Sequence, residues 1–566
     1  MKKTAAPLYA IGVDYGTNSC RALLVDIRDG TELATHVFPY PAGEAGIILD
    51  PKDPNLARQN PADYIQGFLA CVKAVVKQAK KIKGFDPGKV VGIGVDTTGS
   101  TPIPVDAKGR PLAMTRKFAK NPAAHAWLWK DHTSFAEAEA ITAAARKAGA
   151  PYLEKCGGTY SSEWFWSKVW HCKKVAPAVF EAAASWVELC DFVPAYVTGT
   201  LDPSKMARSI CAAGHKAMYS EEWGGLPSKA FLRKLDPALA DLRDRLYGPG
   251  QVKASDQVAG FLIPEVAKET GLPRDIPVAV GAFDAHHGAV GAGIKPGTLV
   301  KIIGTSTCDM LVADARTKVP DIPGICGIVP GSIVPGMTGM EAGQSAVGDI
   351  FLWFSRHLAP AAYTKTGNAI ANLEKEAATT KPGASGLIAL DWNNGNRTVL
   401  VDPMLGGLLV GQTLHTTAPE VYRALVEATA FGALAIIRRF EEFGVKVKEV
   451  VNCGGIAEKS PFTMQIYADV CNRPMRVSRS AQTCALGAAI FGAVVGGAYP
   501  GTAAAQKAMT GVKDACYRPK PANVKVYAEL FPLYLALHDA FGRTGKHPDL
   551  EPVMKKLIEI RTKARR

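Results

Sequence analysis

The sequence predicts an α/β fold in two large domains, and three observations support this prediction. The chain has 566 residues, whereas a single hydrophobic core stops growing at roughly 250–300 residues. Short apolar runs typical of buried strands alternate with segments of helical periodicity, which favours mainly parallel sheets covered by helices. The same motif, a Gly-Thr turn followed by an apolar strand, also occurs twice at an offset of 288 residues, in residues 14–26 (DYGTNSCRALLVD) and in residues 302–314 (IIGTSTCDMLVAD).

The first half begins with a predicted hairpin. Residues 8–16 (LYAIGVDYG) form an apolar run that ends in a carboxylate and a turn, and residues 21–30 return as a second strand. Residues 32–40 can add a third strand. Residues 61–82 start at a proline and carry apolar residues at helical spacing, which predicts a helix. Residues 89–100 (KVVGIGVDTTGS) predict a buried strand that ends in an aspartate and a polar turn.

The second half repeats this order. Residues 298–314 predict another hairpin, residues 418–444 predict a long amphipathic helix closed by its last glycine, and residues 447–457 predict a strand with a Gly-Gly turn. Each half therefore runs hairpin, helix, strand. Residues 484–500 (CALGAAIFGAVVGGAYP) are the most apolar segment, but they are rich in glycine and shorter than the ~20 residues of a membrane span. We expect a buried helix there.

Residues 121–250 have no counterpart in the other half. This stretch holds most of the tryptophans, including those of residues 163–170 (EWFWSKVW), and we expect an insertion that shapes a ligand cleft. Most of these aromatic side chains should simply fill a core, because aromatics at helical spacing usually pack. We place the N-terminal domain at residues 1–293, with the insertion inside it, and the C-terminal domain at residues 294–566.

The bulk composition excludes several classes of protein. With 47% hydrophobic residues the chain is globular, and although its formal charge is +14, the lysines and arginines are scattered rather than gathered into a nucleic-acid patch. The positive field suits an anionic small ligand instead. The twelve cysteines show no C-x-x-C and no spacing typical of a zinc site, which predicts reduced, mostly buried thiols in a cytoplasmic protein.

The N-terminus, MKKTAAPLYA, resembles the beginning of an export signal. Such a signal continues with an apolar region of about 7–15 residues. Here Asp14 interrupts the apolar run after a few residues. We therefore expect a protein that is neither exported nor embedded in a membrane and that works in the cytoplasm.

Both Gly-Thr turns offer hydroxyl groups and tightly turned backbone N–H groups, which suit phosphate oxygens. A single turn of this kind is most often an ordinary hairpin, but two copies in matching positions favour a polyphosphate held between two domains. Asp14 lies beside the first turn, and a carboxylate near phosphate is unfavourable without a cation, so we expect Mg²⁺ there, bound directly or through water. The second turn follows Ile303, and its nearest carboxylate, Asp309, comes later, so we expect no metal in that half.

A candidate general base lies at Asp284, in residues 281–293 (GAFDAHHGAVGAG). An aspartate between a buried strand and a helix rich in small residues can approach a substrate hydroxyl and accept its proton during phosphoryl transfer. A helix N-cap explains the same residue equally well, since Asp is favoured there. We expect His286 and His287 to be structural or to face solvent. The sequence lacks a P-loop, the protein-kinase motifs and a G-x-G-x-x-G after its first strand.

Several segments resemble the FGGY family of carbohydrate kinases: the paired hairpins, GAFDAHHGA, residues 452–474 (NCGGIAEKSPFTMQIYADVCNRP) and residues 407–427 (GLLVGQTLHTTAPEVYRALVE). Gln412 departs from the aliphatic residue usual in the last of these, and residues 160–171 (YSSEWFWSKVWH) match the family's N-terminal signature poorly. Further blocks, GVDTTGSTPIPVD, AAGHK, IGTSTCDM and MEAGQSAVGDIFLWF, resemble the branch of the family that phosphorylates ribulose. Together the blocks cover most of the chain from about residue 9 to about residue 500.

The resemblance implies an actin-like ATPase fold, in which two domains of the ribonuclease H type enclose a cleft. ATP would lie between the two hairpins, with the N-terminal domain binding the sugar and the C-terminal domain binding the nucleotide. Asp284 matches the family's catalytic aspartate, and Asp14 matches the aspartate on the metal side. The nucleotide-binding positions are Gly16, Thr17, Asn18, Arg21, Gly304, Thr305, Ser306, Gly454, Gly455, Lys459 and Asn472. The positions expected around the sugar are Asp96, Thr98, Ser100, Lys216, Asp284 and Glu341.

The resemblance therefore implies an enzyme that uses ATP and Mg²⁺ to phosphorylate a pentulose, with ribulose converted to ribulose 5-phosphate. Two alternatives stay open. The first is a related kinase for xylulose, ribitol or glycerol on the same scaffold. The second is a non-catalytic sugar or nucleotide sensor, although intact hairpins and a retained base argue against it. We expect no nucleic-acid or membrane partner, and a homodimer is expected from the resemblance alone.

Overall fold

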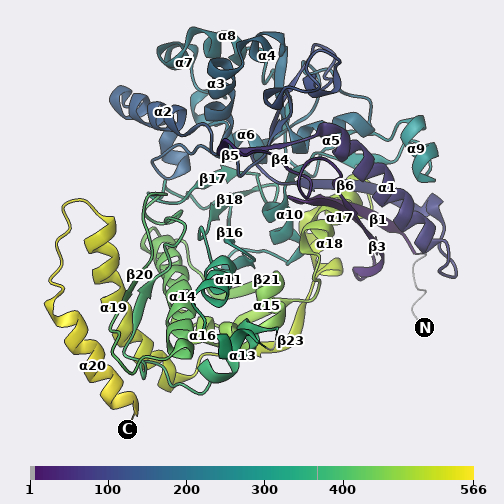
Figure 1. Ribbon diagram of the computed structural model, residues 1–566. Helices are drawn as coiled ribbons and strands as arrows, with labels where there is room; N and C mark the ends of the chain where they lie inside the picture. The colour runs from purple at the N-terminus through teal and green to yellow at the C-terminus, as the bar shows by residue number, and fades with distance from the viewer. Residues whose placement is uncertain (1–6, 366, 566) are drawn as a thin grey trace.

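The computed structural model of the protein describes residues 7–365 and 367–565. Residues 1–6, the basic start of the segment weighed as an export signal, lie outside the described residues. The chain forms two lobes, each built around a seven-stranded sheet (Figure 1). This arrangement confirms the predicted α/β fold with two related halves. Among the described helices, none has both the length and the apolar character needed to cross a membrane.

The N-terminal sheet places the predicted hairpin at its centre. β1 runs antiparallel to β2 and parallel to β6, so that Asp14 lies opposite Arg21 on one side and opposite Asp96 on the other. Both β1 and β6 are almost fully buried, as their apolar runs predict. In spatial order the strands are β12 (Val258–Phe261), β13 (Pro277–Ala279), β6 (Val90–Thr97), β1 (Tyr9–Tyr15), β2 (Ser19–Asp26) and β3 (Thr31–Pro39), with β14 (Ala282–Phe283) also paired to β6.

The C-terminal sheet repeats this centre. β15 runs antiparallel to β16 and parallel to β21, which are the same kinds of neighbour that β1 has. The repeated turn in the sequence therefore reflects a repeated topology. A further strand, β18, pairs with β16 as β3 pairs with β2, and the sequence pattern did not reveal it. In spatial order the strands are β17 (Gly327–Pro330), β18 (Met337–Ala342), β16 (Thr307–Asp314), β15 (Thr298–Ile303), β21 (Glu449–Cys453), β22 (Met475–Ser478) and β23 (Val512–Tyr517).

Two predicted helices form as expected. α1 (Pro61–Ala79) starts at the predicted proline, and the Asn60 side chain accepts a backbone hydrogen bond at its N-terminus. α14 (Ala418–Glu442) starts with a capping box formed by Thr417 and Glu420, which satisfies backbone N–H groups that the first turn leaves free. The buried faces of the two helices belong to the main apolar cores of the two lobes.

The predicted buried helix of the apolar segment is α17 (Thr483–Val495), and it packs in the opposite lobe. It lies against β1 and β6 of the N-terminal sheet and against α10 (Asp284–Gly291) (Figure 1). Glycine allows the backbones to meet, because a Cβ atom at Gly12 would lie 1.7 Å from the carbonyl oxygen of Ala485. The C-terminal half of the sequence thus completes the core of the N-terminal lobe.

The residues of the expected insertion form a separate apolar core. The tryptophans that pack there are Trp127, Trp164, Trp166, Trp170 and Trp186. Their burial confirms the prediction that these rings mainly fill a core. All twelve cysteines lie within the described residues as free thiols, and most of them are buried, as the sequence also predicts.

Candidate active site

Three carboxylates meet at one edge of the N-terminal sheet. β1 and β6 are parallel and in register, so Asp14 lies beside Asp96. β14 also runs parallel to β6 and brings Ala282 opposite Asp96, so Asp284, the first residue of α10, follows just beyond the same edge. The crevice outside the carboxyl ends of parallel strands is the usual place for ligands in open α/β sheets. The topology thus gathers three residues that are distant in sequence.

Burial raises the pKa of all three carboxyl groups, and repulsion between carboxylates adds to the shift for Asp96 and Asp284. Burial, followed by the charge of Asp14, raises the pKa of Asp284 to about 7. Burial, Asp14 and Asp284 together raise the pKa of Asp96 well above its ordinary value. Burial also raises the pKa of Asp14, although Arg21 lies 3.5 Å away and opposes the shift. A carboxyl group with a pKa near 7 is suited to accept a proton at physiological pH.

The Asp96 carboxyl group fits a cation. It is fully buried, and apart from the neighbouring Asp14 carboxyl group no side chain of the described residues pairs with its oxygens. An ionised carboxylate in such a place is unfavourable unless a positive charge compensates it. Mg²⁺ prefers carboxylate oxygens and keeps several of its waters. Asp14 and Asp96 together form a donor set that suits Mg²⁺, whereas the sequence had suggested Asp14 alone.

The first Gly-Thr turn is held by the rest of the N-terminal half. The Thr17 hydroxyl accepts a hydrogen bond from Trp129 Nε1 at 3.0 Å, and the Thr17 carbonyl accepts one from Gln59 Nε2 at 2.7 Å. The Asn18 side chain donates to the Ala45 carbonyl at 2.7 Å. The turn is therefore fixed in shape, while its backbone stays partly exposed and open to a ligand.

The second Gly-Thr turn is anchored on α11 (Gly348–His357). The N–H group of Val347, just before this helix, donates to the Thr305 carbonyl at 2.8 Å. Gly304 and Thr305 are exposed, and Ser306 is half-buried. Both predicted turns thus present accessible groups at the ends of equivalent strands.

The acidic residue of the second hairpin is already neutralised. Lys301 and Asp309 face each other across β15 and β16, and the Lys301 amine lies 2.8 Å from both Asp309 oxygens. The same amine donates to the Gln344 side chain at 2.9 Å. Because Asp309 has a buried cationic partner and Asp96 has none among the residues that the structure describes, the two hairpins differ in their capacity to hold a metal ion.

The residues expected around adenosine lie on the turn after β21, on α15 (Gly455–Lys459) and after α16 (Pro461–Cys471). A Cβ atom at Gly454 would lie 2.4 Å from the last carbonyl oxygen of β15, so the turn after β21 lies against the base of the second Gly-Thr turn. Gly455 and Lys459 are the first and last residues of the short helix α15 and are exposed. Asn472 follows α16 in a left-handed conformation. It therefore lies about 16 Å, one helix length, from the start of α16.

Lys216 and Glu341 form a buried ion pair between the two halves of the chain. Lys216 ends α6 (Ile210–Lys216), and its amine donates to both oxygens of Glu341, on β18, at 3.0 and 3.1 Å. Burial alone would raise the pKa of Glu341, but Lys216, followed by His215 and His286, lowers it to about 2. The pair is therefore ionised, and it presents hydrogen-bond donors and acceptors that suit a polyol.

The turn after β6 is fixed by the surrounding protein. The Thr98 N–H group donates to the Tyr15 carbonyl at 2.9 Å, which ties this turn to the end of β1. Ser100 is fully buried, and its hydroxyl donates to Glu188 while its carbonyl accepts from Lys168 Nζ at 2.9 Å. The Ser100 hydroxyl, which was expected to contact sugar, is thus engaged within the protein framework.

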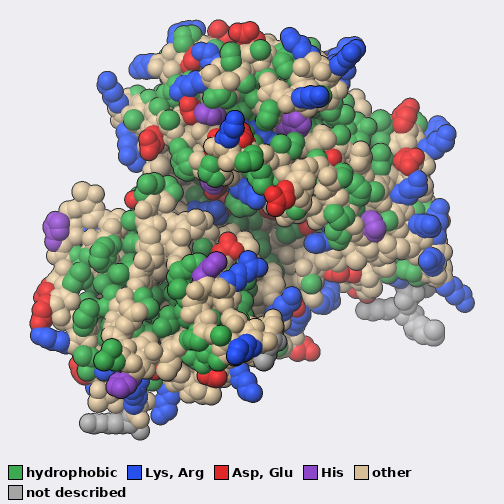
Figure 2. Space-filling view, in the orientation of Figure 1, with side chains coloured by type: hydrophobic (Ala, Val, Ile, Leu, Met, Phe, Trp, Pro, Cys, Tyr) green, Lys and Arg blue, Asp and Glu red, His purple; other side chains and the backbone are tan. Residues whose placement is uncertain are grey.

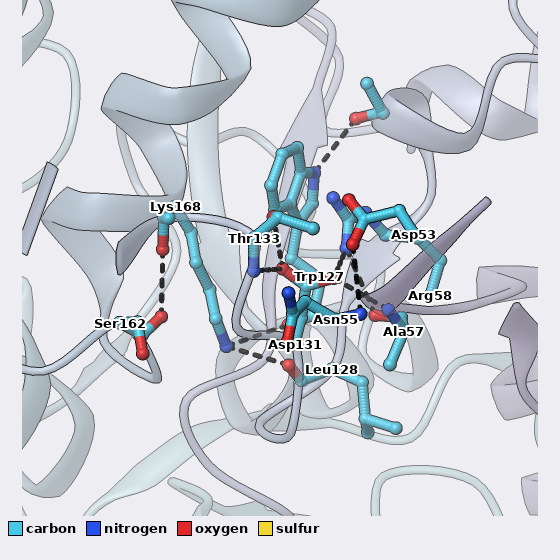
Figure 3. Close-up of polar contacts among 12 residues, drawn as sticks. Asp53, Asn55, Ala57, Arg58, Trp127, Leu128, Asp131, Thr133, Ser162 and Lys168 are labelled. Carbon is cyan, nitrogen blue, oxygen red and sulfur yellow. Dashed lines mark hydrogen bonds and ion pairs between the residues drawn. The ribbon is translucent and has the colours of Figure 1, made fainter. Parts of the chain in front are cut away.

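Lys168 is the centre of a hydrogen-bonded framework that connects separate segments of the chain and that sequence reasoning missed (Figure 3). Its buried amine donates to the Leu128 carbonyl at 2.8 Å, as Figure 3 shows. The same amine donates to the Ser100 carbonyl at 2.9 Å. One cation therefore ties the turn after β6 to the segment that carries Trp129 and, through it, to the first Gly-Thr turn. Burial lowers the pKa of Lys168 to about 7, although Glu188 opposes the shift. A lysine inside an aromatic-rich block was the only sequence signal of this role.

Arg58 and Asp131 brace the same segment. The Arg58 guanidinium lies 3.4 Å from the centroid of the Trp127 ring and pairs with Asp131, as Figure 3 shows. Asp131 also accepts a hydrogen bond from the Ala57 N–H group at 2.7 Å. Buried charges are rare unless they are paired. These partners lie on separate segments, so no local sequence pattern could reveal them.

The carboxylate cluster lies where the two halves of the chain meet. Burial raises the pKa of Cys308, in the second hairpin, to about 12, and the charge of Asp284 adds to this shift. Beyond the effect of burial, Asp14, Asp96 and Asp284 all raise the pKa of Cys484, at the start of α17. Figure 2 shows a deep hollow between the two lobes. A cluster in this position can act on a ligand that both halves contact.

These features together define a class of protein, a two-lobed phosphotransferase. The paired turns suit phosphate, the carboxyl groups suit a cation and proton transfer, and a buried polar pair lies between the related lobes. Family comparison agrees with this class. The N-terminal domain of the FGGY family of carbohydrate kinases matches residues 9–291, and the C-terminal domain of that family matches residues 299–495. The chain belongs to the FGGY family of carbohydrate kinases.

Individual relatives extend over almost the whole chain. The protein is 42% identical to the ribulokinase of Halalkalibacterium halodurans and 43% identical to that of Geobacillus thermodenitrificans, in each case over 98% of both chains. Among solved structures, the xylulose kinase of Rhodospirillum rubrum has the same fold, with a TM-score of 0.77 and 24% identity over 94% of this chain and 98% of that one. These likenesses confirm the expected two-domain fold.

Proposed function

We propose that the protein transfers the terminal phosphoryl group of ATP to the terminal hydroxyl of ribulose, giving ribulose 5-phosphate. The observation that carries this proposal is Asp284, a buried carboxyl group with a pKa of about 7 whose charge interacts with both Asp14 and the Lys216–Glu341 pair. Relatives that are more than 40% identical over nearly the full length are ribulokinases, which favours ribulose over other polyols.

In this mechanism Asp284 accepts a hydrogen bond from the terminal hydroxyl of the sugar. It then takes the proton as the hydroxyl oxygen attacks the outermost phosphorus of ATP. Such a transition state needs little covalent help from the protein, so positioning and charge neutralisation account for most of the rate. Lys216 and Glu341 orient the other sugar hydroxyls, and Thr98 lines the turn beside them.

The nucleotide lies between the two Gly-Thr turns, whose backbone N–H groups bind its phosphates. Mg²⁺, held by Asp14 and Asp96 directly or through water, supplies positive charge that offsets the phosphates. Gly454, Gly455 and Lys459 border the adenosine. We propose the domain boundary between residues 293 and 294, with sugar contacts mainly from the first domain and nucleotide contacts mainly from the second.

The test is ATP consumption by the full-length protein in the presence of Mg²⁺, with and without a panel of free sugars and polyols. The panel contains both enantiomers of ribulose, together with xylulose, ribitol and glycerol. One enantiomer of ribulose should give a kcat/KM about tenfold or more above every other compound, and phosphorus NMR should locate the phosphate at carbon 5.

Two outcomes would contradict the proposal. Preferred turnover of xylulose, ribitol or glycerol would reassign the substrate within the family. Binding of sugar or nucleotide without sugar-stimulated ATP consumption would identify a sensor instead of an enzyme.

We also propose a cytoplasmic location, because free and mostly buried thiols suit a reducing compartment. A homodimer stays an expectation from the family resemblance. Light scattering tests it against the chain mass of 60.1 kDa.

A further inference from the structure

A cluster of metal-ligating side chains lies next to the Lys216–Glu341 pair and has no part in the mechanism above. Cys211 and His215 are four residues apart on α6, so they lie on the same side of the helix, and His286 lies on α10. One ligand atom from each of the three residues lies within 4.8 Å of the other two. All three residues are only 1% exposed.

The hydrogen bonds of His215 leave one of its ring nitrogens bare. The Ser332 hydroxyl donates to the Val329 carbonyl at 2.9 Å, so its oxygen acts as the acceptor toward His215 Nε2, 3.0 Å away. Nε2 therefore carries the proton, and Nδ1 keeps a lone pair. This Nδ1 lies 3.3 Å from a Glu341 oxygen and has no hydrogen-bond partner among the described residues. Two acceptors thus face each other in a buried site, which favours a cation between them.

His286 adds two further nitrogens without partners. Neither Nδ1 nor Nε2 forms a hydrogen bond within the described part of the chain. Nε2 lies 3.7 Å from the same Glu341 oxygen, and the ring centroid lies 4.5 Å from that of His215. A neutral imidazole ring keeps a lone pair on one of its nitrogens, which is the form that ligates metals. Buried ring nitrogens normally pair with a hydrogen-bonding group or a metal ion.

We propose that Cys211, His215 and His286 bind one Zn²⁺ ion, with a Glu341 oxygen as the fourth ligand. Zinc accepts sulfur, imidazole nitrogen and carboxylate oxygen in tetrahedral sites. Bonds of about 2.0–2.3 Å place such ligand atoms roughly 3.3–3.8 Å apart, so the cluster has to close by about 1 Å. Ser332 holds His215 in the tautomer that ligates through Nδ1. The Cys211 thiol loses its proton to solvent as the zinc–sulfur bond forms.

Zinc and sugar should exclude each other. Ligation of zinc by the Glu341 oxygen that faces the histidines draws this oxygen away from Lys216 and weakens the pair that the mechanism uses to orient the sugar. This competition rests on the proposed function, whereas zinc binding itself does not. The cluster would therefore make the sugar site sensitive to free zinc.

The test measures zinc binding by the full-length protein directly. Metal-free protein is dialysed against zinc chloride, and the bound metal is counted by atomic emission. Wild type should bind one zinc per chain, and the Kd should rise about tenfold or more in Cys211→Ser and in His286→Gln. Cys190→Ser is the matched control, because Cys190 packs in the same small apolar cluster as Cys211 but contributes no ligand atom. Circular dichroism verifies that each variant is folded.

Kinetics then test the competition. At saturating MgATP, zinc should raise the KM for ribulose without changing kcat, and ribulose should raise the apparent Kd for zinc. No bound zinc in wild type, or undiminished zinc binding in both cluster variants, overturns the site. Zinc binding without competition overturns the role of Glu341 as the fourth ligand. If no sugar is turned over at all, dialysis still decides the zinc site, because it does not depend on activity.

Discussion

At the scale of single residues, similar carboxyl groups acquire different chemistry from their neighbours. Glu341 and Asp284 are both buried, and burial disfavours their charged forms. Lys216 outweighs that effect for Glu341, whose pKa is about 2, whereas the nearby Asp14 adds to it for Asp284, whose pKa is about 7. One carboxylate is therefore a permanent anion, and the other can gain and lose a proton near neutral pH.

Replacing Asp284 with asparagine should nearly abolish turnover while leaving sugar affinity largely intact. The amide keeps the shape of the side chain but cannot take the proton, and a positioned base contributes roughly 10²–10⁴-fold in rate. A coupled assay measures kcat, and calorimetry measures the Kd for ribulose. A kcat within a few-fold of wild type would remove Asp284 from the mechanism.

The rate should rise with pH through neutrality. Asp284 must be ionised to accept a proton, and its pKa is raised to about 7 by burial and by Asp14. Below that value kcat/KM for ribulose should fall about tenfold per pH unit, and above it the rate should level off. The residual activity of Asp284→Asn should lack this inflection. A flat wild-type profile across the neutral range would contradict the assignment of the base.

Replacing Asp96 with asparagine should stabilise the folded protein and weaken the binding of Mg²⁺ by the enzyme. The folded-state pKa of this carboxyl group is raised by burial, Asp14 and Asp284, so its ionisation at neutral pH opposes folding. In the absence of Mg²⁺, the free energy of unfolding should increase by about 1–3 kcal/mol at pH 7. The gain should vanish at low pH, where Asp96 is protonated in both states.

Thermal unfolding measures the stability of Asp96→Asn, and a Mg²⁺ titration of the rate measures its metal dependence. The Mg²⁺ concentration for half-maximal rate should rise. An unchanged titration curve would exclude Asp96 from the cation site and leave Asp14 alone there.

At the scale of elements, local patterns predicted much of the frame of the site. Both hairpins, α1, α14 and the strands after them follow from runs of apolar residues and from turn and cap residues. The meeting of Asp14 and Asp96 also follows, because parallel neighbours end at the same edge of a sheet. These features depend on interactions close in sequence, which a single sequence displays directly.

Contacts between distant segments could not be predicted in this way. Lys168, on α3 (Phe165–Val175), hydrogen-bonds Leu128, which lies outside any helix, and Trp129 reaches Thr17 in the first hairpin. The cluster around His286 likewise combines side chains from two helices. Its ligands therefore show no zinc spacing along the sequence, and sequence analysis did not find it. Each of these contacts depends on how helices and strands pack together, and a local sequence pattern does not predict that packing.

Replacing Lys168 with methionine should raise the KM for ribulose more than it lowers kcat. Methionine keeps the buried shape but leaves the carbonyls of Leu128 and Ser100 without their donor. We expect a KM increase of about tenfold and a loss of about 1–3 kcal/mol in the free energy of unfolding. Lys173→Met, on the same helix, is the control, because that amine pairs with Asp236 at a partly exposed site.

Steady-state kinetics separate the two parameters, and urea unfolding gives the stability. If the folded Lys168→Met variant keeps the wild-type KM, the framework has no influence on the sugar site. An equal KM increase in Lys173→Met would point to a general disturbance of the helix.

At the scale of the whole molecule, the two lobes are joined by more than the connection between them. The Lys216–Glu341 pair joins them at the proposed sugar site, and Arg397 lies 3.6 Å from Glu163 of the insertion. α17 lies in an apolar cluster that combines residues of both sheets, and it packs directly against β1, β6 and α10. Changes at these contacts should therefore affect stability and catalysis together.

Replacing Gly12 with alanine should destabilise the whole protein, because the new Cβ atom would lie 1.7 Å from the Ala485 carbonyl and force α17 away from β1. Overpacking of this kind costs about 1–3 kcal/mol or more in the free energy of unfolding. Gly406→Ala is the control, since a Cβ atom there meets nothing within 4 Å. Urea unfolding compares the variants, and equal stability of both would refute the close approach of α17.

The position of α17 also sets an order for synthesis. The strands of the first sheet leave the ribosome early, but the helix that covers β1 and β6 is encoded by residues 483–495. A nascent chain therefore carries an uncovered apolar groove during most of its translation, the kind of surface that chaperones recognise. The lobe made first is completed only after residues 483–495 have emerged.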